Sequence, residues 1–236
     1  MTTNSYINII KFRKCKIRRE IFGRMDEKNI SQAVISRLPR YLRYLGELKD
    51  ANVERISSQE LSELMHVTAS QIRQDFNNFG GFGQQGYGYK VNYLYDEIAQ
   101  ILGINKTHHL IIVGAGNLGQ ALANYMNFER RGFHFTGIFD CNEALQGKKI
   151  RDMYVQPMSN LEAFVKENDI DIAVLTIPKT SAVTVADQLV KCGVKAFWNF
   201  AHVDLNVSDD IVVENVHLSD SLMKLTYNIT TKEQEL

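Results

Sequence analysis

The residue pattern with the clearest chemistry is a glycine-rich turn at residues 114–119, which has the form Gly-x-Gly-x-x-Gly. An apolar stretch at residues 110–113 precedes the turn, and Asp140 ends the next apolar stretch about 20 residues after the last glycine. This spacing is typical of a dinucleotide-binding turn, in which N–H groups at the start of a helix bind a pyrophosphate. The turn consists of Gly114, Ala115, Gly116, Asn117, Leu118 and Gly119.

Each glycine of the turn has its own expected role. Gly114 permits the tight turn, Gly116 lets the backbone approach a pyrophosphate, and Gly119 lets the helix pack on the strand. The carboxylate of Asp140 can accept hydrogen bonds from both ribose hydroxyls and would repel a 2′-phosphate. We therefore expect NADH and NAD⁺ as ligands, and another adenine-containing ligand is the alternative.

Alternating strands and helices must position this turn. After Asp140 we expect helices at 161–167 and 181–192 and strands at 172–176 and 196–199, which predicts an α/β fold with a doubly wound parallel sheet. Ligands bind at the carboxyl ends of such strands. Two segments, residues 176–178 and 199–201, follow the predicted strands at these ends. The alternative interpretation is that both are ordinary strand-to-helix loops. The candidates for the nicotinamide side are Thr176, Pro178, Asn199, Phe200 and Ala201.

The chain before this domain is predicted to form short helices. Apolar residues recur at helical spacing from about residue 31 to 48, and Pro39 predicts a short turn before a main helix that starts at or just after the proline. Capping-box patterns at residues 57–60 (Ser-x-x-Glu) and 68–71 (Thr-x-x-Gln) open two further helices, which end near residues 65 and 78.

Only two residues separate these last two helices, which matches a helix-turn-helix. An ordinary helix pair is the alternative, because residues 25–103 carry 8 basic and 10 acidic residues and so do not show the basic excess usual in DNA-binding domains. The residues expected to face inward are Leu61, Leu64, Val67, Ile72 and Phe76.

The second helix would present polar side chains to DNA. Arg and Gln can make bidentate hydrogen bonds to guanine and adenine edges. The glycine-rich segment 79–90 predicts a hairpin-like wing whose tip enters a minor groove. Arg37, Arg40 and Arg43 recur every three residues, as either a phosphate-facing stripe or a solvated face. The candidate DNA-binding residues are Thr68, Ser70, Gln71, Arg73, Gln74, Gln84, Gln85 and Arg40.

The first 24 residues differ in charge from the rest of the chain. The formal net charge of the whole chain is zero, yet this segment holds seven basic residues and one acidic residue. Such an arm could add nonspecific phosphate contacts. Because Met25 is a second plausible start, we expect residues 1–24 to be a disordered leader, dispensable or misassigned, rather than a functional arm.

Composition excludes several classes of protein. The 3 cysteines have no pairing or metal-type spacing, which suits a reducing cytoplasm. The sequence has no apolar run of about 18–20 residues, so we expect no membrane partner. The 6 histidines form no evident ligand set or catalytic triad. We therefore expect no metal site.

The chain leaves little room for a catalytic domain. Only about 35 residues follow Phe200, and they predict one strand at 211–213 and one helix at 219–227, so we expect no enzyme activity. The last helix carries apolar residues with few partners in the chain, which favours docking on a second subunit. The predicted organisation is a leader (1–24), a winged-helix domain (25–103), a Rossmann NAD(H)-binding domain (104–218) and a dimerisation helix with a tail (219–236).

From about residue 30 to 229 the chain resembles the redox-sensing transcriptional repressors of the Rex family. The resemblance is collinear across both domains, and its motifs are specific. It is carried by the segments Ile35–Arg43, Val67–Arg73, Tyr87–Tyr89, Val113–Gly119, Leu175–Pro178, Trp198–Ala201 and Val213–Val216.

The resemblance implies a homodimer of winged-helix and Rossmann domains with an exchanged C-terminal helix. Such a dimer binds double-stranded operator DNA, represses respiratory or fermentative genes and releases its operator when NADH binds. The family's coupling arginine falls on Arg43, and its tyrosine on the helix after the glycine turn falls on Tyr125. Where some members have Asp-Phe at the start of the exchanged helix, this chain has His217-Leu218, so His217 would replace the acid as an acceptor.

Two other classes remain as alternatives. An NAD-dependent oxidoreductase would turn over a substrate and bind no operator. A CoA or adenine-nucleotide binding module would share the Rossmann fold, although Asp140 disfavours a phosphorylated ribose.

Overall fold

The computed structural model describes residues 30–79 and 87–234. The chain divides into two compact units, one that ends at Asn105 and one that begins at Lys106. The leader at residues 1–24 and the wing tip at Gln84 and Gln85 lie outside the described residues.

Unit 1 is helical, with a two-stranded antiparallel sheet at one edge. Its core is built from apolar side chains of every helix from α3 to α6, with Leu38, Leu45 and Leu94 fully buried. The helices are α2 (Gln32–Ile35), α3 (Leu38–Asp50), α4 (Ser58–Met65), α5 (Ala69–Asn77) and α6 (Val91–Ile101), and the strands are β1 (Arg55–Ile56) and β2 (Tyr89–Lys90).

Local signals place the helix boundaries of unit 1. Pro39 lies in the first turn of α3, where its missing N–H costs no hydrogen bond. Ser57 and Glu60 form both hydrogen bonds of a capping box at α4, as predicted. At α5 only half of the predicted box forms, because the Thr68 hydroxyl accepts from the Gln71 N–H but the Gln71 side chain bonds elsewhere.

Unit 2 contains a seven-stranded sheet in the order β5-β6-β4-β3-β7-β8-β9, parallel except for the β5–β6 pair. The chain builds outward from β3 through β4 to β6 and then returns to β7 on the other side of β3. This reversal confirms the doubly wound α/β class. The strands are β3 (His108–Val113), β4 (Phe133–Asp140), β5 (Lys149–Ile150), β6 (Met153–Pro157), β7 (Ile172–Leu175), β8 (Ala196–Asn199) and β9 (Val212–Asn215).

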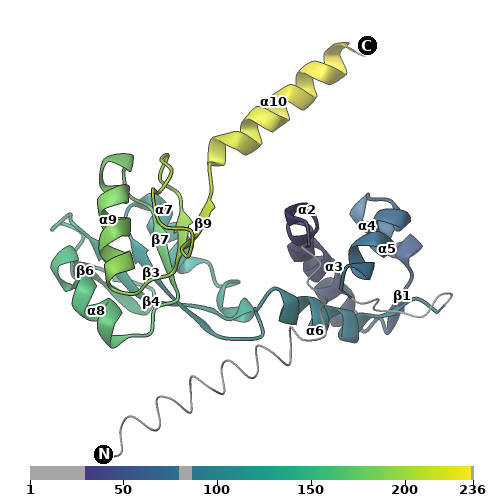
Figure 1. Ribbon diagram of the computed structural model, residues 1–236, viewed down its shortest axis with the longest axis horizontal. Helices are drawn as coiled ribbons and strands as arrows, with labels where there is room; N and C mark the ends of the chain where they lie inside the picture. The colour runs from purple at the N-terminus through teal and green to yellow at the C-terminus, as the bar shows by residue number, and fades with distance from the viewer. Residues whose placement is uncertain (1–29, 80–86, 235–236) are drawn as a thin grey trace, which may run out of the picture. The chain divides into compact units, whose positions relative to one another are not determined.

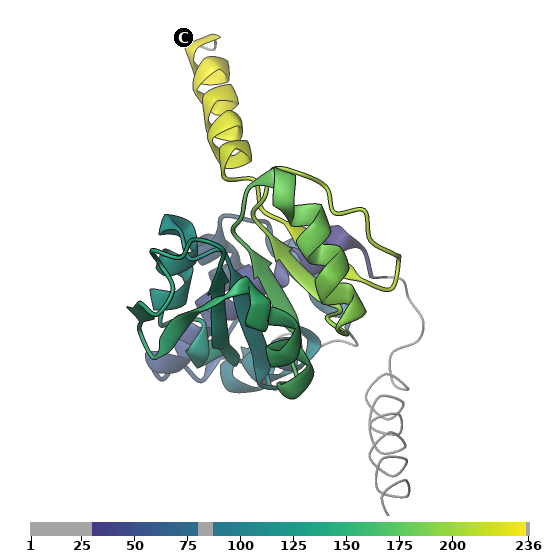
Figure 2. The same cartoon turned by 90° about the vertical axis from the view of Figure 1, so that its left-hand side faces the viewer.

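Helices cover both faces of this sheet (Figures 1 and 2). Alternate residues of β3 serve opposite faces: Ile111 and Val113 pack with α8 and α9, whereas Leu110 and Ile112 pack with α7. The helices are α7 (Asn117–Asn124), α8 (Leu161–Glu167), α9 (Lys179–Lys191) and α10 (Leu218–Gln234), with 3-10 turns at Glu129–Arg131 and Met158–Asn160.

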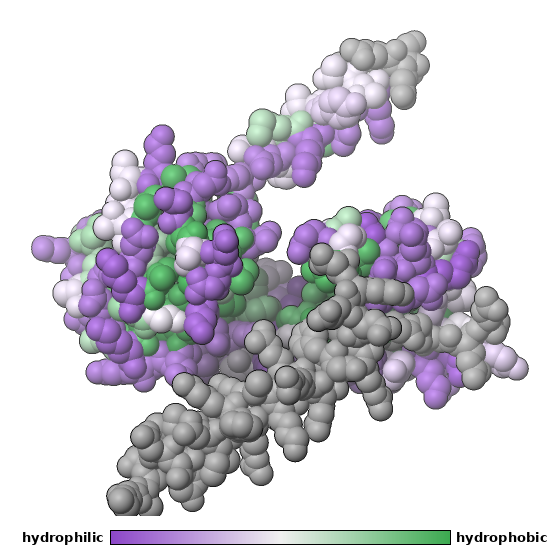
Figure 3. Space-filling model, viewed as in Figure 1, coloured by the Kyte–Doolittle hydropathy of each residue, from purple (hydrophilic) through white to green (hydrophobic). Residues whose placement is uncertain are grey.

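The last helix, α10, is longer than the helix predicted at 219–227. Its apolar side chains reach the surface, as Figure 3 also shows. The residues that are at least half exposed are Leu218, Leu222, Met223, Leu225, Tyr227 and Ile229. None of the helices described here is long and apolar enough to cross a membrane.

Candidate functional site

In unit 1, α4 and α5 form the predicted helix-turn-helix. The turn between them is possible because His66 adopts a left-handed backbone conformation, with φ of 52°. Of the residues predicted to face inward, Leu61, Ile72 and Phe76 are buried, but Leu64 is 44% exposed. Met65 is buried instead, because it lies one turn after Leu61 on the same face of α4.

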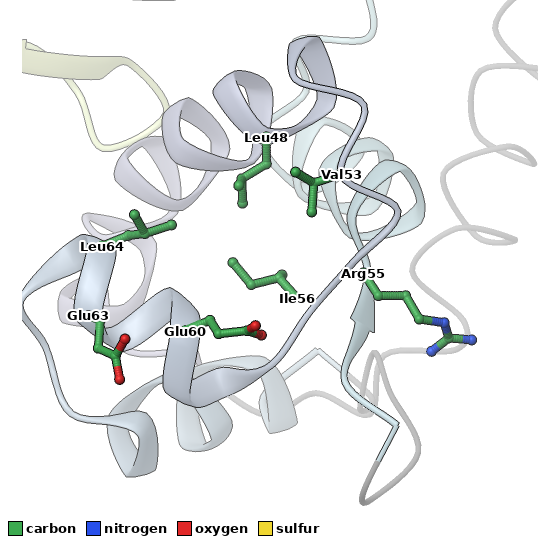
Figure 4. A pocket seen from close by; sticks show the side chains of 7 residues that line it. All are labelled: Leu48, Val53, Arg55, Ile56, Glu60, Glu63 and Leu64. Carbon is green, nitrogen blue, oxygen red and sulfur yellow. The ribbon is translucent and has the colours of Figure 1, made fainter.

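Leu64 lines a hollow of about 390 Å³ between α3, β1 and α4. In Figure 4 the side chains of Leu48, Val53 and Ile56 surround this hollow, and Glu60 and Glu63 lie on the α4 side. Leu64 therefore lies beside apolar residues of unit 1, although it is not buried in the core as predicted.

The exposed face of α5 is polar. Ser70, Arg73, Gln74 and Asn77 are exposed and follow one another at the spacing of a single helix face. Asn77 was not predicted from the sequence, although the same spacing from Ser70 could have identified it. The Arg73 guanidinium donates a 2.9 Å hydrogen bond to the hydroxyl of Ser58 on α4, which orients it along this face.

The opposite face of α5 carries a buried carboxylate. Asp75 is 0% exposed and accepts two 2.7 Å hydrogen bonds from the Arg37 guanidinium and one of 2.8 Å from the Tyr41 hydroxyl. The side-chain amide of Gln71 donates a further 2.8 Å bond. Two predictions are therefore corrected: Arg37 belongs to neither a phosphate stripe nor a solvated face, and the half-buried Gln71 turns its amide inward.

The protonation of this network follows from its contacts. Burial alone would raise the pKa of Asp75, but hydrogen bonds from Arg37, Tyr41 and Gln71 outweigh it and hold the pKa below its usual value. Burial, together with the bond to Asp75, raises the pKa of Tyr41 well above its usual range. The carboxylate is therefore charged and the phenol neutral near pH 7.

The other predicted arginines of α3 are exposed. Arg40 donates a hydrogen bond to the backbone carbonyl of Met65 at the end of α4, so it also braces the helix-turn-helix. The guanidinium of Arg43 lies over the ring of Tyr44, 5.3 Å from its centroid. Thr68 caps α5 with its hydroxyl and is itself exposed, so it keeps donor capacity toward solvent.

The described part of the predicted wing segment pairs in an unexpected way. Its strand β2 pairs with β1, which lies before α4, with Arg55 opposite Lys90 and Ile56 opposite Tyr89. The Arg55 guanidinium adds a 2.9 Å bond to the Tyr87 carbonyl. A hairpin internal to residues 79–90 remains a prediction, because its tip lies outside the described residues.

In unit 2, the glycine turn joins β3 to α7 at the point where the strand order reverses, and its three glycines are needed for different reasons. Gly114 has φ of +106°, and a Cβ there would lie 2.5 Å from the Thr176 carbonyl oxygen. At Gly119 a Cβ would lie 1.9 Å from the carbonyl oxygen of Gly114. At Gly116 such a Cβ would have no described residue other than its chain neighbours within 4 Å, so the space beside it is open to a ligand.

The turn offers N–H groups to a phosphate and has a carboxylate beside it. No side chain in the described part of the chain caps α7, whose N-cap is Gly116, so its first N–H groups keep their capacity to bind an anion. The Asp140 carboxylate stands beside the turn, where it accepts bonds from the N–H groups of Ala115 (2.6 Å) and Asn142 (2.7 Å). It thereby fixes the turn while presenting an acidic group at the end of β4.

The predicted ring-side residues Tyr125 and Phe200 are linked by a chain of edge-packed aromatic rings. Ring centroids lie 4.9 Å apart for Tyr125–Phe128, 5.6 Å for Phe128–Trp198 and 4.7 Å for Trp198–Phe200. Tyr125 is the C-cap of α7 rather than a residue within that helix, and it is 52% exposed. Phe128 was missed from the sequence because it lies between regular elements.

Thr176 and Asn199 shape the carboxyl ends of β7 and β8. The Thr176 hydroxyl donates a 2.8 Å bond to the Gly114 carbonyl and so holds the glycine turn. Asn199 is 0% exposed, and its side chain bonds the Val203 carbonyl, the Asn215 side chain and the Ala201 N–H. Asn199 therefore shapes this loop, and its contact with a ligand stays a prediction.

The remaining ring-side candidates lie at the same edge of the sheet. Pro178 is the exposed N-cap of α9, and Ala201 is buried. The ring of His217 stacks on that of His202 with centroids 5.3 Å apart, and its Nδ1 atom is buried without a hydrogen-bond partner among the described residues. The described residues contain no cluster of His, Cys, Asp and Glu able to hold a metal ion.

Comparisons with known proteins agree with both units. A family model described as "Putative DNA-binding protein N-terminus" matches residues 29–77, and one described as "CoA binding domain" matches residues 105–203. A redox-sensing transcriptional repressor Rex from Thermoanaerobacter sp. is 59% identical over 210 residues, 89% of this chain and 94% of the relative. A Rex from Clostridioides difficile is 55% identical, over 86% of this chain and 97% of the relative.

The chain belongs to the Rex family. Members of this family are named transcriptional repressors, so this Rex chain is a repressor and not an enzyme. The Rex-family repressor RSP was solved with β-NAD⁺ and operator DNA (TM-score 0.82, 58% identity, 88% of this chain and 96% of that one). It was also solved with β-NADH (TM-score 0.80, 55% identity, 88% and 98%).

Proposed function

We propose that this Rex chain represses transcription by binding operator DNA through the exposed face of α5, and that it releases the operator when NADH binds to unit 2. One observation carries the proposal. A helix-turn-helix and an open dinucleotide turn occur in one chain that is 58% identical to a repressor solved with β-NAD⁺ and operator DNA.

In unit 1, Arg73 and Gln74 are the side chains we assign to base edges, because they are exposed in the centre of the polar face of α5. Ser70, Thr68 and Arg40 are assigned to neighbouring positions, where shorter or braced groups suit phosphate contacts. The net charge of the domain does not supply nonspecific affinity, so these few contacts must carry much of the binding.

In unit 2, the residues divide into two groups by what they can distinguish. The glycine turn and Asp140 face the phosphates and a ribose, which NADH and NAD⁺ share, so they bind both forms alike. The two forms differ by one positive charge and by planarity at the nicotinamide ring. Only the ring-side residues can distinguish them, and we assign this role to Tyr125, Phe200 and His217.

A ligand shifts a conformational equilibrium only by its differential affinity for the two states. We infer that NADH favours a state of the dimer in which the two copies of α5 no longer match two half-sites about one helical turn apart or a multiple of it. The exposed apolar face of α10 supports a homodimer, because a second copy of the chain would cover it. Operator binding would place the protein in the cytoplasm.

The test uses a duplex obtained by in vitro selection from a random library. Fluorescence anisotropy measures the affinity for this duplex while NADH is added at fixed NAD⁺. We expect micromolar NADH to weaken binding by about 5- to 150-fold, NAD⁺ to leave it intact, and NAD⁺ to compete with NADH for one site. The proposal is wrong if NADH binds the protein yet leaves the affinity for the duplex unchanged.

The same titration on Tyr125→Phe and His217→Ala tests the ring-side assignment. We expect each variant to respond less to NADH while it still binds the selected duplex. If both respond like the parent, the ring-side assignment fails, although the sensing function stands.

A further inference from the structure

The recognition helix α5 has an unusual charge on its buried side. Apolar residues such as Ile72 and Phe76 already fix the depth of the helix in unit 1, and each is at most 1% exposed. Asp75 lies between them and receives four hydrogen bonds from three side chains. Arg37 is the N-cap of α3, and Tyr41 lies in the first turn of that helix.

Stability alone does not explain a carboxylate at this position. Removing two charges from water is costly, and well-packed apolar residues often replace a buried ion pair without loss of stability. What apolar contacts supply poorly is direction, because they permit small rotations of a helix about its axis. A planar guanidinium that bonds both oxygens of one carboxylate allows a single relative orientation.

The orientation matters for the opposite face of α5. Arg73 and Gln74 are exposed on the side away from Asp75. A helix with its side chains has a radius of about 5–6 Å, so a rotation of about 20° would move their ends by roughly 2 Å. Base-edge hydrogen bonds have heavy-atom distances of about 2.7–3.2 Å and would not survive such a shift.

We propose that Asp75, with Arg37 and Tyr41, is an anchor that sets the rotation of α5 about its axis, and that Gln71 is part of this anchor rather than of the base-contacting face. The proposal rests on operator binding through α5. Gln71 lies one turn before Asp75, and its amide is directed to the same carboxylate oxygen that Arg37 Nη2 bonds. These residues position the contact residues without touching the bases.

The experiment compares affinity and base preference in four variants. Gln71→Ala, Asp75→Asn and Arg37→Lys each alter the anchor. Asp96→Asn is the matched control, because it removes a carboxylate from the exposed pair with Lys49, in which the carboxyl is 69% exposed. For each protein, anisotropy gives the affinity for the selected duplex and for every single-base substitution of it, and thermal melting reports folding.

We expect Gln71→Ala, which removes one of the four bonds to Asp75, to weaken binding by about 2- to 10-fold and to shrink the penalties at all base positions slightly and together. Asp75→Asn and Arg37→Lys are expected to weaken binding by about 10-fold or more and to shrink the penalties at all base positions together. Asp96→Asn should match the parent. NADH affinity should be unchanged throughout.

Two results would overturn the anchor. In the parent, substitution of a directly contacted base should weaken binding by about 5- to 150-fold. If Gln71→Ala abolishes this loss of affinity at one base position and leaves the losses at the other positions unchanged, Gln71 contacts that base. If folded Arg37→Lys keeps every penalty of the parent, the network is only structural, and this variant decides the matter even where Asp75→Asn does not fold. Binding of the parent to the selected duplex separately tests the proposed function, so the two failures are distinguishable.

Discussion

Substitution of Gly116 by alanine separates the demands of the ligand from those of the fold. Apart from its chain neighbours, the new methyl group would have no described residue within 4 Å, and the backbone φ of −70° suits alanine. Lower unfolded-state entropy favours the variant by about 0.4–1 kcal/mol, while alanine is a poorer N-cap than glycine by a similar amount. We therefore expect the melting temperature to stay within about 2 °C of the parent.

Ligand affinity of Gly116→Ala should fall sharply, because the methyl group occupies the space that a pyrophosphate needs beside the start of α7. Loss of one charge-assisted hydrogen bond costs about 1.5–3 kcal/mol, which corresponds to a 10- to 150-fold weaker Kd for both NADH and NAD⁺ by calorimetric titration. The matched variant is Gly119→Ala, whose Cβ would lie 1.9 Å from a carbonyl oxygen.

We expect Gly119→Ala to destabilise the folded protein by about 1–3 kcal/mol through overpacking, and to lower the melting temperature by about 2–12 °C. Parent-like NADH binding by folded Gly116→Ala would refute the reasoning, because it would show that no phosphate approaches this residue.

Three further predictions concern charge. Asp140→Ala should weaken NADH and NAD⁺ by similar factors of about 10- to 150-fold in calorimetric titrations, since both share the ribose; a selective loss of NADH would contradict its role. Deletion of residues 1–24 should leave the salt dependence of duplex binding almost unchanged, whereas a markedly shallower slope of log affinity against log salt would reveal a phosphate-binding arm. Because the pKa of Asp75 is lowered on folding, its contribution to stability should be present above about pH 5 and lost as the pH falls through the folded pKa, so urea unfolding of parent and Asp75→Asn should converge in acid. If the difference in unfolding free energy between the parent and Asp75→Asn stays constant down to pH 2, Asp75 does not carry a stabilising charge in the folded protein.

Much of the fold follows from local sequence. The glycine turn between β3 and α7, the Ser57–Glu60 cap and the proline at the start of α3 each act within a few residues, so their signals are complete in the sequence. The helix predicted at 161–167 is confirmed as α8 for the same reason. Short strands such as β1 and β5, of two residues each, were missed because a period of two needs more than two residues to appear.

The parts of the site that the sequence did not predict depend on contacts between distant residues. Arg37 and Asp75 are separated by 38 positions, and nothing near either one distinguishes a buried ion pair from two solvated charges. The stacked pair of His202 and His217 and the ring chain through Phe128 are likewise formed by loops and strand ends that only the completed sheet brings together. The sequence shows the types of these residues, but only the structure shows which residues they contact.

The anchor at Asp75 also bears on how a signal could reach DNA. The resemblance to the Rex family assigns coupling to Arg43, which lies two residues after Tyr41 on α3, about 3 Å further along the helix axis. Asp75 of α5 is bonded to Arg37 and Tyr41 at the start of α3. Because of these bonds, α5 moves together with α3 when α3 is displaced. If Arg43 has the coupling role, the anchor is the physical link by which a change at α3 becomes a change in the orientation of the base-contacting face. An anchor weakened by Arg37→Lys would then reduce the response to NADH as well as the base preference, whereas a loss of base preference with a full response would place the coupling outside α3.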